Sequence, residues 1–595
     1  MKEKSQTREE VVSQLAHRID GFEKYPLGHS STMAALACEL AARLGLSKID
    51  IEAIEEAALL HDIGLHAMAP SYYSSGDPLS FEERIDLWRH PVIGEQQMAK
   101  HGCSRHAQLL VRWHHEWWNG TGYPDMLAYE DIPIGARIIR AVDLHGALTS
   151  DRPYRNRLSE EAALTELAES AGVECDPYIV EVLLALLSEK AETAAESRQE
   201  PIPYPGQLET EPSSSTIENG TQPKEESEGG AATEPSGLDA HWTAEEVGSR
   251  AGVADSYLPE PPARAPAEAP SIIATFAPAP PSDRVKSRQW LDWKSGRYSR
   301  KSLLGFEASV LRQIEFKSVA IPFCGRARLE WYLSAWGKQI LSNDNRAWAA
   351  ALSRAVIGAG EPLGEEVVSR LLEDAYVPAA RLGNPGLRRW FGEADAWFLD
   401  NLRRNIDAIS DEEQRAEALA IGLLTGDYAL SFDERTAELK RPLNSVFRAF
   451  ANRSYVMLRG RARGRINTYN LPALDFIRRA RSDLLYLDVP VAQVEIAGSE
   501  ARSEWRDCWV TRGETIEAQE NPQSKKAYLE SIDQLLRSAS HIKTWALAIQ
   551  ETGLTSARDL SDLIKEHRQA HTTYSKDLTE VAGGFRNYIV VATAG

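Results

Sequence analysis

Apolar residues in the first 190 positions recur at helical spacing. One clear helix ends at Gly45 and has apolar positions at Met33, Leu36, Ala37, Leu40, Ala41 and Leu44. Ser47 and Asp50 have the spacing of an N-terminal capping box, and they open a second helix that runs on to Gly64. No convincing strand pattern precedes residue 190, so we expect residues 1–190 to form an all-helical domain.

The pattern changes twice after residue 190. Residues 191–280 are rich in Pro, Glu, Ser and Gly, a composition that cannot bury enough apolar surface to fold, so we expect a disordered acidic linker. In residues 281–595, helical stretches alternate with short apolar runs at 317–323, 339–344, 483–488, 541–549 and 587–594. This alternation is typical of a parallel α/β sheet, with the helical segment 345–440 inserted between strands.

Length and charge fit a multidomain protein. At 595 residues the chain is too long for one hydrophobic core. Its formal net charge of -20 disfavours nonspecific attraction of the whole chain to nucleic acid. No apolar run approaches the roughly 18 residues of a membrane span, and the polar start resembles no secretory signal. We therefore expect a cytoplasmic protein with no membrane contact, and its five separated cysteines argue against a thiolate metal site.

Histidine is concentrated in the expected helical domain, where ten of the 14 histidines fall within the first 145 residues. Imidazoles and carboxylates are the side chains that hold a water-activating divalent ion. Seven candidate ligands could converge from facing helices: His29, His61, Asp62, His90, His114, His115 and Asp143. Two ions could share this set, because a carboxylate such as Asp62 can bridge them. A single histidine is more often a core or surface residue than a ligand, and we assign that role to His17, His66, His101, His106 and His145.

Two strings near these residues carry a resemblance to a known family. HHEWWNGTGYP at 114–124 reproduces an HHExxxGxGYP signature, and LLHDIG at 59–64 supplies an HD pair. Together they resemble the HD-GYP family over nearly all of residues 29–180. The resemblance implies a helical phosphodiesterase that cleaves a cyclic dinucleotide, such as cyclic di-GMP, with divalent iron or manganese ions.

The same resemblance assigns roles to residues. It makes the seven candidates the metal ligands and gives His61 and Asp62 a catalytic role. It places Arg152 and Arg155 at the guanine or phosphate contact, and it adds the loop of Gly122, Tyr123 and Pro124 to the substrate site. The glycines of this loop could instead serve a tight structural turn.

Two positions depart from the family pattern. Leu65 stands where the family usually has a lysine that binds the substrate phosphate, which leaves the substrate open. This departure also permits an alternative, a sensor that binds the dinucleotide without turnover. Tyr25 stands where members with a third metal carry a glutamate, so the sequence favours two metals.

The C-terminal domain resembles adenine-specific DNA methyltransferases of the Dam type, which implies a Rossmann-like fold. The similar segments are LDWKSGRY at 291–298, AIPFCGRARLEWYL at 320–333 with ILSND beyond it, and DLLYLDVPV at 483–491. The resemblance implies S-adenosylmethionine as cofactor, bound by Trp293, Gly325 and Asp344, and a catalytic Asp488. The family's catalytic tyrosine is Val491 here, so we expect an inactive or retuned methyltransferase fold. Two alternatives stay open: an unrelated α/β domain, and a methyltransferase regulated by the helical half.

An arginine-rich stretch stands out against the acidic background. It includes Arg448, Arg453, Arg459, Arg461, Arg463 and Arg465, interleaved with aromatic residues. Such a stretch can hold the phosphates of nucleic acid with little sequence preference, and DNA is the expected partner. A solvated or acid-paired face is the alternative.

Overall fold

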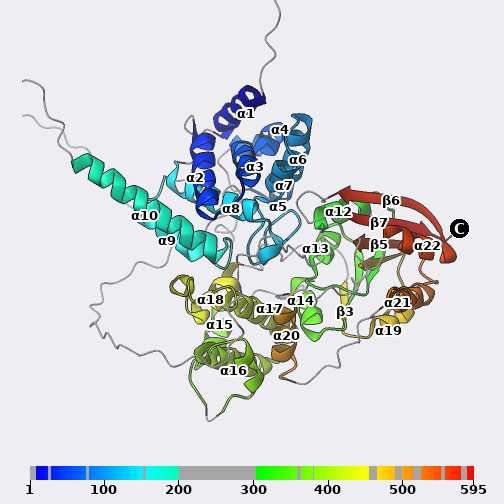
Figure 1. The fold of residues 1–595 in the computed structure, drawn as a ribbon. Coiled ribbons are helices and arrows are strands. Elements are labelled where there is room, and N and C mark those ends of the chain that lie inside the picture. The colour runs from blue at the N-terminus through cyan, green and yellow to red at the C-terminus, as the bar shows by residue number, and fades with distance from the viewer. Residues whose placement is uncertain are drawn as a thin grey trace, which may run out of the picture.

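The structure is a computed structural model, and it describes residues 8–23, 28–74, 79–151, 156–199, 303–357, 363–379, 381–453, 466–488, 499–513, 524–550, 556–577 and 586–594. Within these residues the chain forms a helical N-terminal half and an α/β C-terminal half, which lie against each other (Figure 1). The predicted linker falls almost entirely in residues 200–302, which are outside the described part of the chain.

The N-terminal half consists of helices, as predicted. They are α1 (Arg8–Glu23), α2 (His29–Arg43), α3 (Lys48–Leu59), α4 (Ile63–Met68), η1 (Ser71–Ser74), α5 (Phe81–Leu87), α6 (His90–Lys100), α7 (Arg105–Trp113), η2 (Tyr129–Asp131), α8 (Ile134–Thr149), α9 (Glu160–Ser170) and α10 (Pro177–Gln199). The Ser47 side chain accepts a hydrogen bond from the Asp50 N–H and so caps α3. Apart from one isolated bridge between Ala171 and Cys175, the described residues before 200 contain no β-structure.

One hydrophobic core holds these helices together. It contains the predicted apolar stripe of α2, for which Ala37, Leu40 and Ala41 are fully buried. It also contains Leu303, which lies beyond the linker. The helix α10 continues to Gln199, past the predicted boundary at residue 190. The N-terminal core is therefore completed by a residue from the other half.

The C-terminal half combines seven strands with many helices. In chain order they are α12 (Leu304–Leu311), β1 (Ser318–Ile321), α13 (Arg328–Ala335), β2 (Gln339–Asn343), α14 (Ala347–Ile357), α15 (Glu365–Leu372), η4 (Pro385–Arg389), α16 (Glu393–Asp407), α17 (Glu412–Ala429), η5 (Ala437–Leu439), α18 (Leu443–Arg453), β3 (Ile466–Tyr469), α19 (Ala473–Arg479), β4 (Leu484–Asp488), α20 (Ser499–Val510), α21 (Lys525–Ser538), β5 (Thr544–Gln550), α22 (Ala557–His567), β6 (Gln569–Asp577) and β7 (Arg586–Thr593). The helical insertion predicted at 345–440 is confirmed as α14 to α17.

The strands form one sheet in the order β3-β2-β1-β4-β5-β7-β6. Neighbours from β3 to β5 are parallel, whereas β7 is antiparallel to both β5 and β6. The strand order reverses between β1 and β4. In parallel sheets, ligand sites are typically found at the carboxyl ends of the strands beside such a reversal.

Alternate residues of each strand face two different helical layers, as the two-residue period of a strand requires. Val319 and Ile321 of β1 belong to a large core shared with helices of the inserted segment. Ala320 between them belongs to a second core that includes residues of α19, α21 and α22. The sheet is therefore covered on both faces, which agrees with its continuous apolar runs.

Two details of the strand prediction need correction. The expected sheet was parallel, but β7 reverses direction and makes the sheet mixed. Strands β3 (INTY) and β6 (QAHTTYSKD) were not predicted at all, because both are edge strands with polar residues and no continuous apolar run. The five predicted apolar runs are confirmed as β1, β2, β4, β5 and β7.

No helix among the described residues combines the length and apolarity needed to cross a bilayer. All five cysteines are free thiols in this structure.

Candidate metal centre

Five of the seven candidate ligands lie at three helix junctions. His61 and Asp62 form the turn between α3 and α4, and His90 is the first residue of α6. His114 and His115 directly follow α7. These junctions belong to neighbouring helices, so residues that are far apart in the sequence can reach one centre.

A close approach between α4 and α6 brings two of these junctions together. A Cβ atom on Gly64 would lie 2.0 Å from the carbonyl oxygen of His90 and 2.5 Å from the amide nitrogen of Gly94. No side chain fits there, so glycine at position 64 sets the distance between the Asp62 turn and His90.

Hydrogen bonds to the backbone orient three of the histidines. The Nδ1 atoms of His61, His90 and His114 lie 3.0, 2.7 and 2.6 Å from the carbonyl oxygens of Ala58, Leu87 and Val111. Because a carbonyl only accepts, each Nδ1 must donate its proton, which leaves the Nε2 lone pair for a metal ion.

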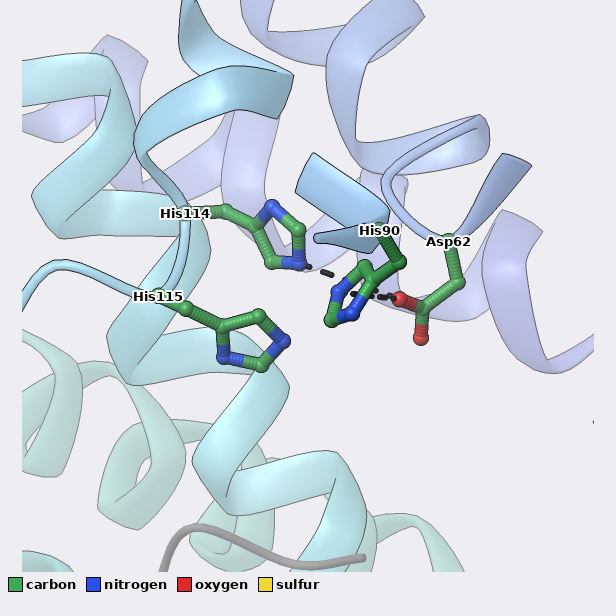
Figure 2. A group of neighbouring side chains, drawn as sticks. All are labelled: Asp62, His90, His114 and His115. Carbon is green, nitrogen blue, oxygen red and sulfur yellow. Dashed lines mark ion pairs between the residues drawn. The ribbon is translucent and has the colours of Figure 1, made fainter. Parts of the chain in front are cut away.

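The first ligand group consists of Asp62, His90, His114 and His115, whose donor atoms all lie within 4.8 Å of one another (Figure 2). The Oδ1 atom of Asp62 is 3.2 Å from His90 Nε2 and 3.8 Å from His114 Nε2. All three histidines are at least 91% buried. This group has three nitrogens and one oxygen around a common point, which is a plausible set for a divalent transition metal.

The second group shares Asp62 with the first. The Oδ2 atom of Asp62 is 3.2 Å from His61 Nε2, and Asp143 Oδ1 lies 3.9 Å from the same nitrogen. Glu23 completes this group, with its carboxylate within 4.8 Å of the His61 and Asp62 ligand atoms. Asp62 therefore offers one oxygen to each group, the arrangement of a bridging carboxylate.

Glu23 was missed by the sequence reasoning, although the sequence contains a signal for it. It lies at the end of α1 on the buried stripe formed by Val12, Leu15, Ala16 and Ile19. A carboxylate at such a position is buried and needs a partner. Tyr25, which argued for two metals, is outside the described residues.

His29 lies at the start of α2, close to the second group. A Cβ atom on Gly146, three residues after Asp143, would lie 3.2 Å from the His29 ring. Burial and the neighbouring His61 lower the pKa of His29, which keeps the imidazole neutral and able to bind a metal. The structure thus brings six of the seven predicted ligands together and places the seventh, His29, beside them.

The carboxylate of Asp62 dominates the electrostatics of the centre. Burial alone would raise the pKa of Asp62, but the neighbouring His61 holds it well below its usual range. Burial lowers the pKa of His114 and of His115. Burial also disfavours protonation of His61, but Asp62 outweighs this and raises its pKa to about 10.

The residues present fit a divalent metal. Asp62 Oδ1, His90 Nε2 and His114 Nε2 are buried, and none has a hydrogen bond of acceptable geometry in the described part of the chain. Buried polar atoms normally find a partner, so three such atoms that face one another form a donor set suited to a divalent cation.

Replacing Gly64 with Ala should weaken metal binding. The new Cβ atom would push α4 away from α6 and separate Asp62 from His90. We expect about a 10- to 100-fold loss of Mn²⁺ affinity, as when the groups that orient metal ligands are removed. Titration followed by electron paramagnetic resonance would measure it.

Gly21→Ala is the matched control, because nothing lies within 4 Å of a Cβ atom at that exposed position in α1. It should bind Mn²⁺ like the wild type. Unchanged affinity in Gly64→Ala would show that the spacing of α4 and α6 does not set the ligand geometry.

The loop of Gly122, Tyr123 and Pro124 packs against His115. A Cβ atom on Gly122 would lie 2.4 Å from the His115 carbonyl oxygen. The Tyr123 ring is 5% exposed and lies between the rings of His115 and Trp88, at centroid distances of 4.9 and 5.3 Å. This geometry favours the structural interpretation of the loop over direct substrate contact.

Position 65 is apolar, and Arg140, which lies beside the ligands, is paired with carboxylates. Leu65 is 3% exposed and packs in an apolar cluster with Leu79 and Leu87, so no charge is available there. Arg140 was not predicted, but its Nη1 lies 3.4 Å from His115 Nδ1 and 3.3 Å from Asp143 Oδ2. Its Nη2 donates to the buried Glu174 at 2.6 Å. Arg152 and Arg155 are outside the described residues.

The predicted cofactor site of the C-terminal half fits S-adenosylmethionine poorly. Asp344 follows β2, is 6% exposed, and accepts backbone N–H hydrogen bonds from Gly325 and Arg346, each 2.9 Å long. Both carboxylate oxygens of Asp344 therefore accept backbone hydrogen bonds at the position where the resemblance implies the ribose contact. Asp488 ends β4 and is half-buried. Trp293, Pro490 and Val491 lie outside the described residues.

The arginine-rich stretch is only partly described. Arg448 on α18 pairs with Glu365, and the neighbouring Phe447 and Phe450 are buried. These contacts match the acid-paired alternative for this part. The residues predicted to bind nucleic acid are all outside the described chain: Arg459, Arg461, Arg463 and Arg465.

Comparison with known proteins agrees with the geometry of the N-terminal half. The family model for the HD domain matches residues 12–179. The N-terminal region is therefore an HD domain. The matched range contains every candidate ligand described above.

Several curated proteins are similar over this region. The cyclic di-GMP phosphodiesterase response regulator RpfG of Xanthomonas campestris is 34% identical over 186 residues, which cover 31% of this chain and 49% of RpfG. The 3'3'-cGAMP-specific phosphodiesterase 2 of Vibrio cholerae is 31% identical over 182 residues, which cover 30% of this chain and 35% of that protein. The chain thus spans less than half the length of either relative.

A solved structure of a cyclic GMP-AMP specific phosphodiesterase from V. cholerae also aligns, with a TM-score of 0.26 and 21% identity. The alignment covers 32% of this chain and 53% of that one.

Proposed function

We propose that the HD domain is a metal-dependent phosphodiesterase that hydrolyses a cyclic dinucleotide. The observation that carries the proposal is the position of Asp62, which offers one oxygen to each of two ligand groups. The names of the similar proteins, which act on cyclic di-GMP or cGAMP, support the substrate class.

Asp62, His90, His114 and His115 would hold one divalent ion, and the second would be held by His29, His61, Asp62 and Asp143, with Glu23 as a further carboxylate. Two such metal ions, of iron or manganese, would supply an activated water and would neutralise charge on the phosphoryl group. The backbone carbonyls fix the donor nitrogens in place. Burial of the histidines excludes bulk water from the ligand atoms and strengthens their electrostatic interactions.

The test uses the full-length protein and measures both metal content and turnover. We expect about two transition-metal ions per chain and the release of a linear dinucleotide from cyclic di-GMP or 3'3'-cGAMP, detected by chromatography. Chelation should stop the reaction, and added Mn²⁺ should restore it. Hydrolysis by metal-free protein would contradict the proposal.

A non-hydrolytic sensor is the second candidate, and the apolar environment of Leu65 favours it. This position offers no cation to the phosphate. The metal site would then bind the dinucleotide without hydrolysing it. Binding of the dinucleotide to metal-loaded protein with no product over several hours would support the sensor and reject the enzyme.

For the C-terminal half we infer a methyltransferase-type fold that does not use the cofactor. The parallel strand order β3-β2-β1-β4-β5 supports the fold. The backbone bonds to Asp344, together with Val491 in place of the family's tyrosine, argue against activity. Transfer of a labelled methyl group to DNA by the purified protein would overturn this inference.

A further inference from the structure

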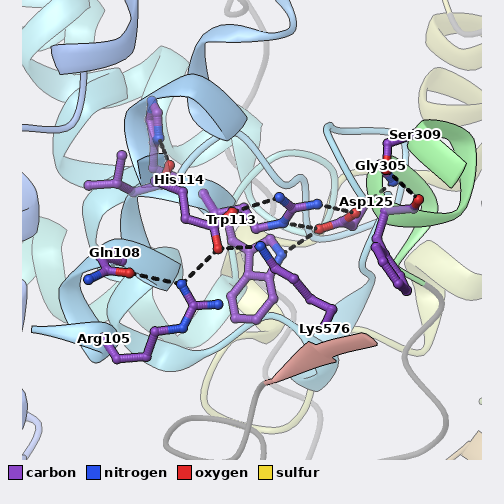
Figure 3. A network of polar contacts seen from close by, with 12 residues as sticks. Arg105, Gln108, Trp113, His114, Asp125, Gly305, Ser309 and Lys576 are labelled. Atoms are coloured by element: carbon purple, nitrogen blue, oxygen red, sulfur yellow. Dashed lines mark hydrogen bonds and ion pairs between the residues drawn. The ribbon is translucent and has the colours of Figure 1, made fainter. Parts of the chain in front are cut away.

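A buried network of charged groups lies beside the metal centre (Figure 3). Its first carboxylate, Glu95 on α6, is 3% exposed. Glu95 accepts hydrogen bonds from Arg105 and Arg112, both 2.8 Å long. It also accepts one of 2.5 Å from Lys576, which lies on β6 in the C-terminal half. Three cations, one of them from the far end of the sheet, thus meet at one carboxylate.

The second carboxylate of the network is Asp125, which is fully buried. It accepts two hydrogen bonds from Arg112, through Nε at 2.7 Å and Nη2 at 3.0 Å. It also accepts bonds of 2.8 Å from the Trp113 indole and from the backbone N–H of Gly305, which lies in α12. Asp125 therefore joins the end of α7 to the C-terminal half.

The network is continuous with the proposed metal ligands. Glu95 lies on α6, the helix that begins with His90. Arg112 lies on the last turn of α7, two residues before His114. A shift of Arg112 would therefore move the helix end that carries two ligands relative to the helix that carries a third.

The C-terminal half also contacts the loop that follows His114 and His115. Arg326, in the turn after β1, donates to the carbonyl oxygen of Asn119 at 3.2 Å. The ring of Trp331 lies 5.7 Å from that of Trp88, which in turn stacks on Tyr123. The loop that follows the two histidines is thus packed against the C-terminal half over much of its length.

We propose that Lys576 is a positioning residue for the N-terminal metal centre. Together with Glu95 it holds Arg112, and through Arg112 it fixes the helix end that carries His114 and His115. The C-terminal half is then a structural part of the phosphodiesterase and not an independent module. This inference rests on the proposed function of the metal centre.

The charges explain why the lysine matters. Without Lys576, Glu95 keeps two arginine partners, but Arg112 must also serve Asp125, which has no other charged partner among the described residues. The half-buried lysine side chain, 24% exposed, therefore balances a carboxylate that would otherwise draw Arg112 towards α6.

The experiment compares Lys576→Met with Lys576→Arg and with the control Lys565→Met in the full-length protein. Lys565 is 59% exposed and forms an exposed ion pair with the nearby Asp562. We expect Lys576→Met to bind Mn²⁺ about tenfold more weakly at 25 °C, the lower end of the loss for groups that orient metal ligands. Lys576→Arg should recover most of the affinity, and Lys565→Met should match the wild type.

Turnover provides a second readout. In Lys576→Met we expect a lower kcat with little change in KM, because the displaced groups hold the metal ligands and not the substrate. The melting temperature, measured in parallel, would show that all variants are folded at 25 °C. A merely structural lysine would alter the melting temperature and leave the Mn²⁺ resonance spectrum unchanged.

The possible failures are distinguishable. Wild-type Mn²⁺ affinity and kcat in Lys576→Met would overturn the positioning role and leave the metal centre intact. A wild-type protein that binds no Mn²⁺ would instead overturn the proposed metal centre, and this inference with it.

Discussion

Asp62→Asn should abolish both metal binding and hydrolysis. Asp62 is the one residue whose two oxygens face both ligand groups, so its amide would offer an N–H₂ donor to one of them. Metal-ion stabilisation of a phosphoryl transition state is worth several kcal/mol. A loss of about 4 kcal/mol corresponds to roughly 10³-fold in rate. Metal analysis and the dinucleotide assay would measure the two effects.

Glu52→Gln is the matched control for this substitution, because Glu52 on α3 is 60% exposed and forms an exposed ion pair with Lys48. It should retain metal and activity. If Asp62→Asn kept its full metal content, the two groups would not share this carboxylate, and the bridging arrangement would be wrong.

Asp125→Asn should destabilise the protein by about 3–5 kcal/mol, the usual effect of breaking a buried ion pair. Each Asp125 oxygen accepts two of the four hydrogen bonds. In asparagine an NH₂ group replaces one of these oxygens, and this donor would face two other donors. Arg112 would keep Glu95 as its only charged partner in the described network. The first transition in urea unfolding would report the loss.

The control for Asp125 is Asp475→Asn, since Asp475 is 48% exposed and lies 3.7 Å from Arg478. We expect its unfolding curve to match the wild type. A first transition unchanged in Asp125→Asn would mean that the two halves do not depend on this carboxylate for their stability.

Local patterns were sufficient to predict the helices and most strands. The stripe of α2, the cap of α3 and the apolar strands β1 and β4 each depend on neighbours in the sequence. The candidate ligands were predicted because the strings HD and HHE lie in contiguous segments that resemble a family signature. The edge strands β3 and β6 were missed because their pairing partners, and not their own residues, make them strands.

The residues that complete the site were harder to predict, for a physical reason. Glu23 and Arg140 are single charged residues in helices, and only the packing of α1 and α8 shows that they reach the ligands. Lys576 lies on a polar edge strand with nothing nearby in the sequence to mark it. Their roles come from contacts between distant segments, which periodicity cannot reveal.

The bond between Lys576 and Glu95 joins residues that are 481 positions apart in the chain. During synthesis, which adds about 5–20 residues per second, domains fold as they emerge. At those rates Glu95 would wait on the order of half a minute to a minute and a half for its partner. On the proposed role of Lys576, the HD domain would therefore fold first without this contact, and the proposed metal centre would be fully held only after β6 has been synthesised.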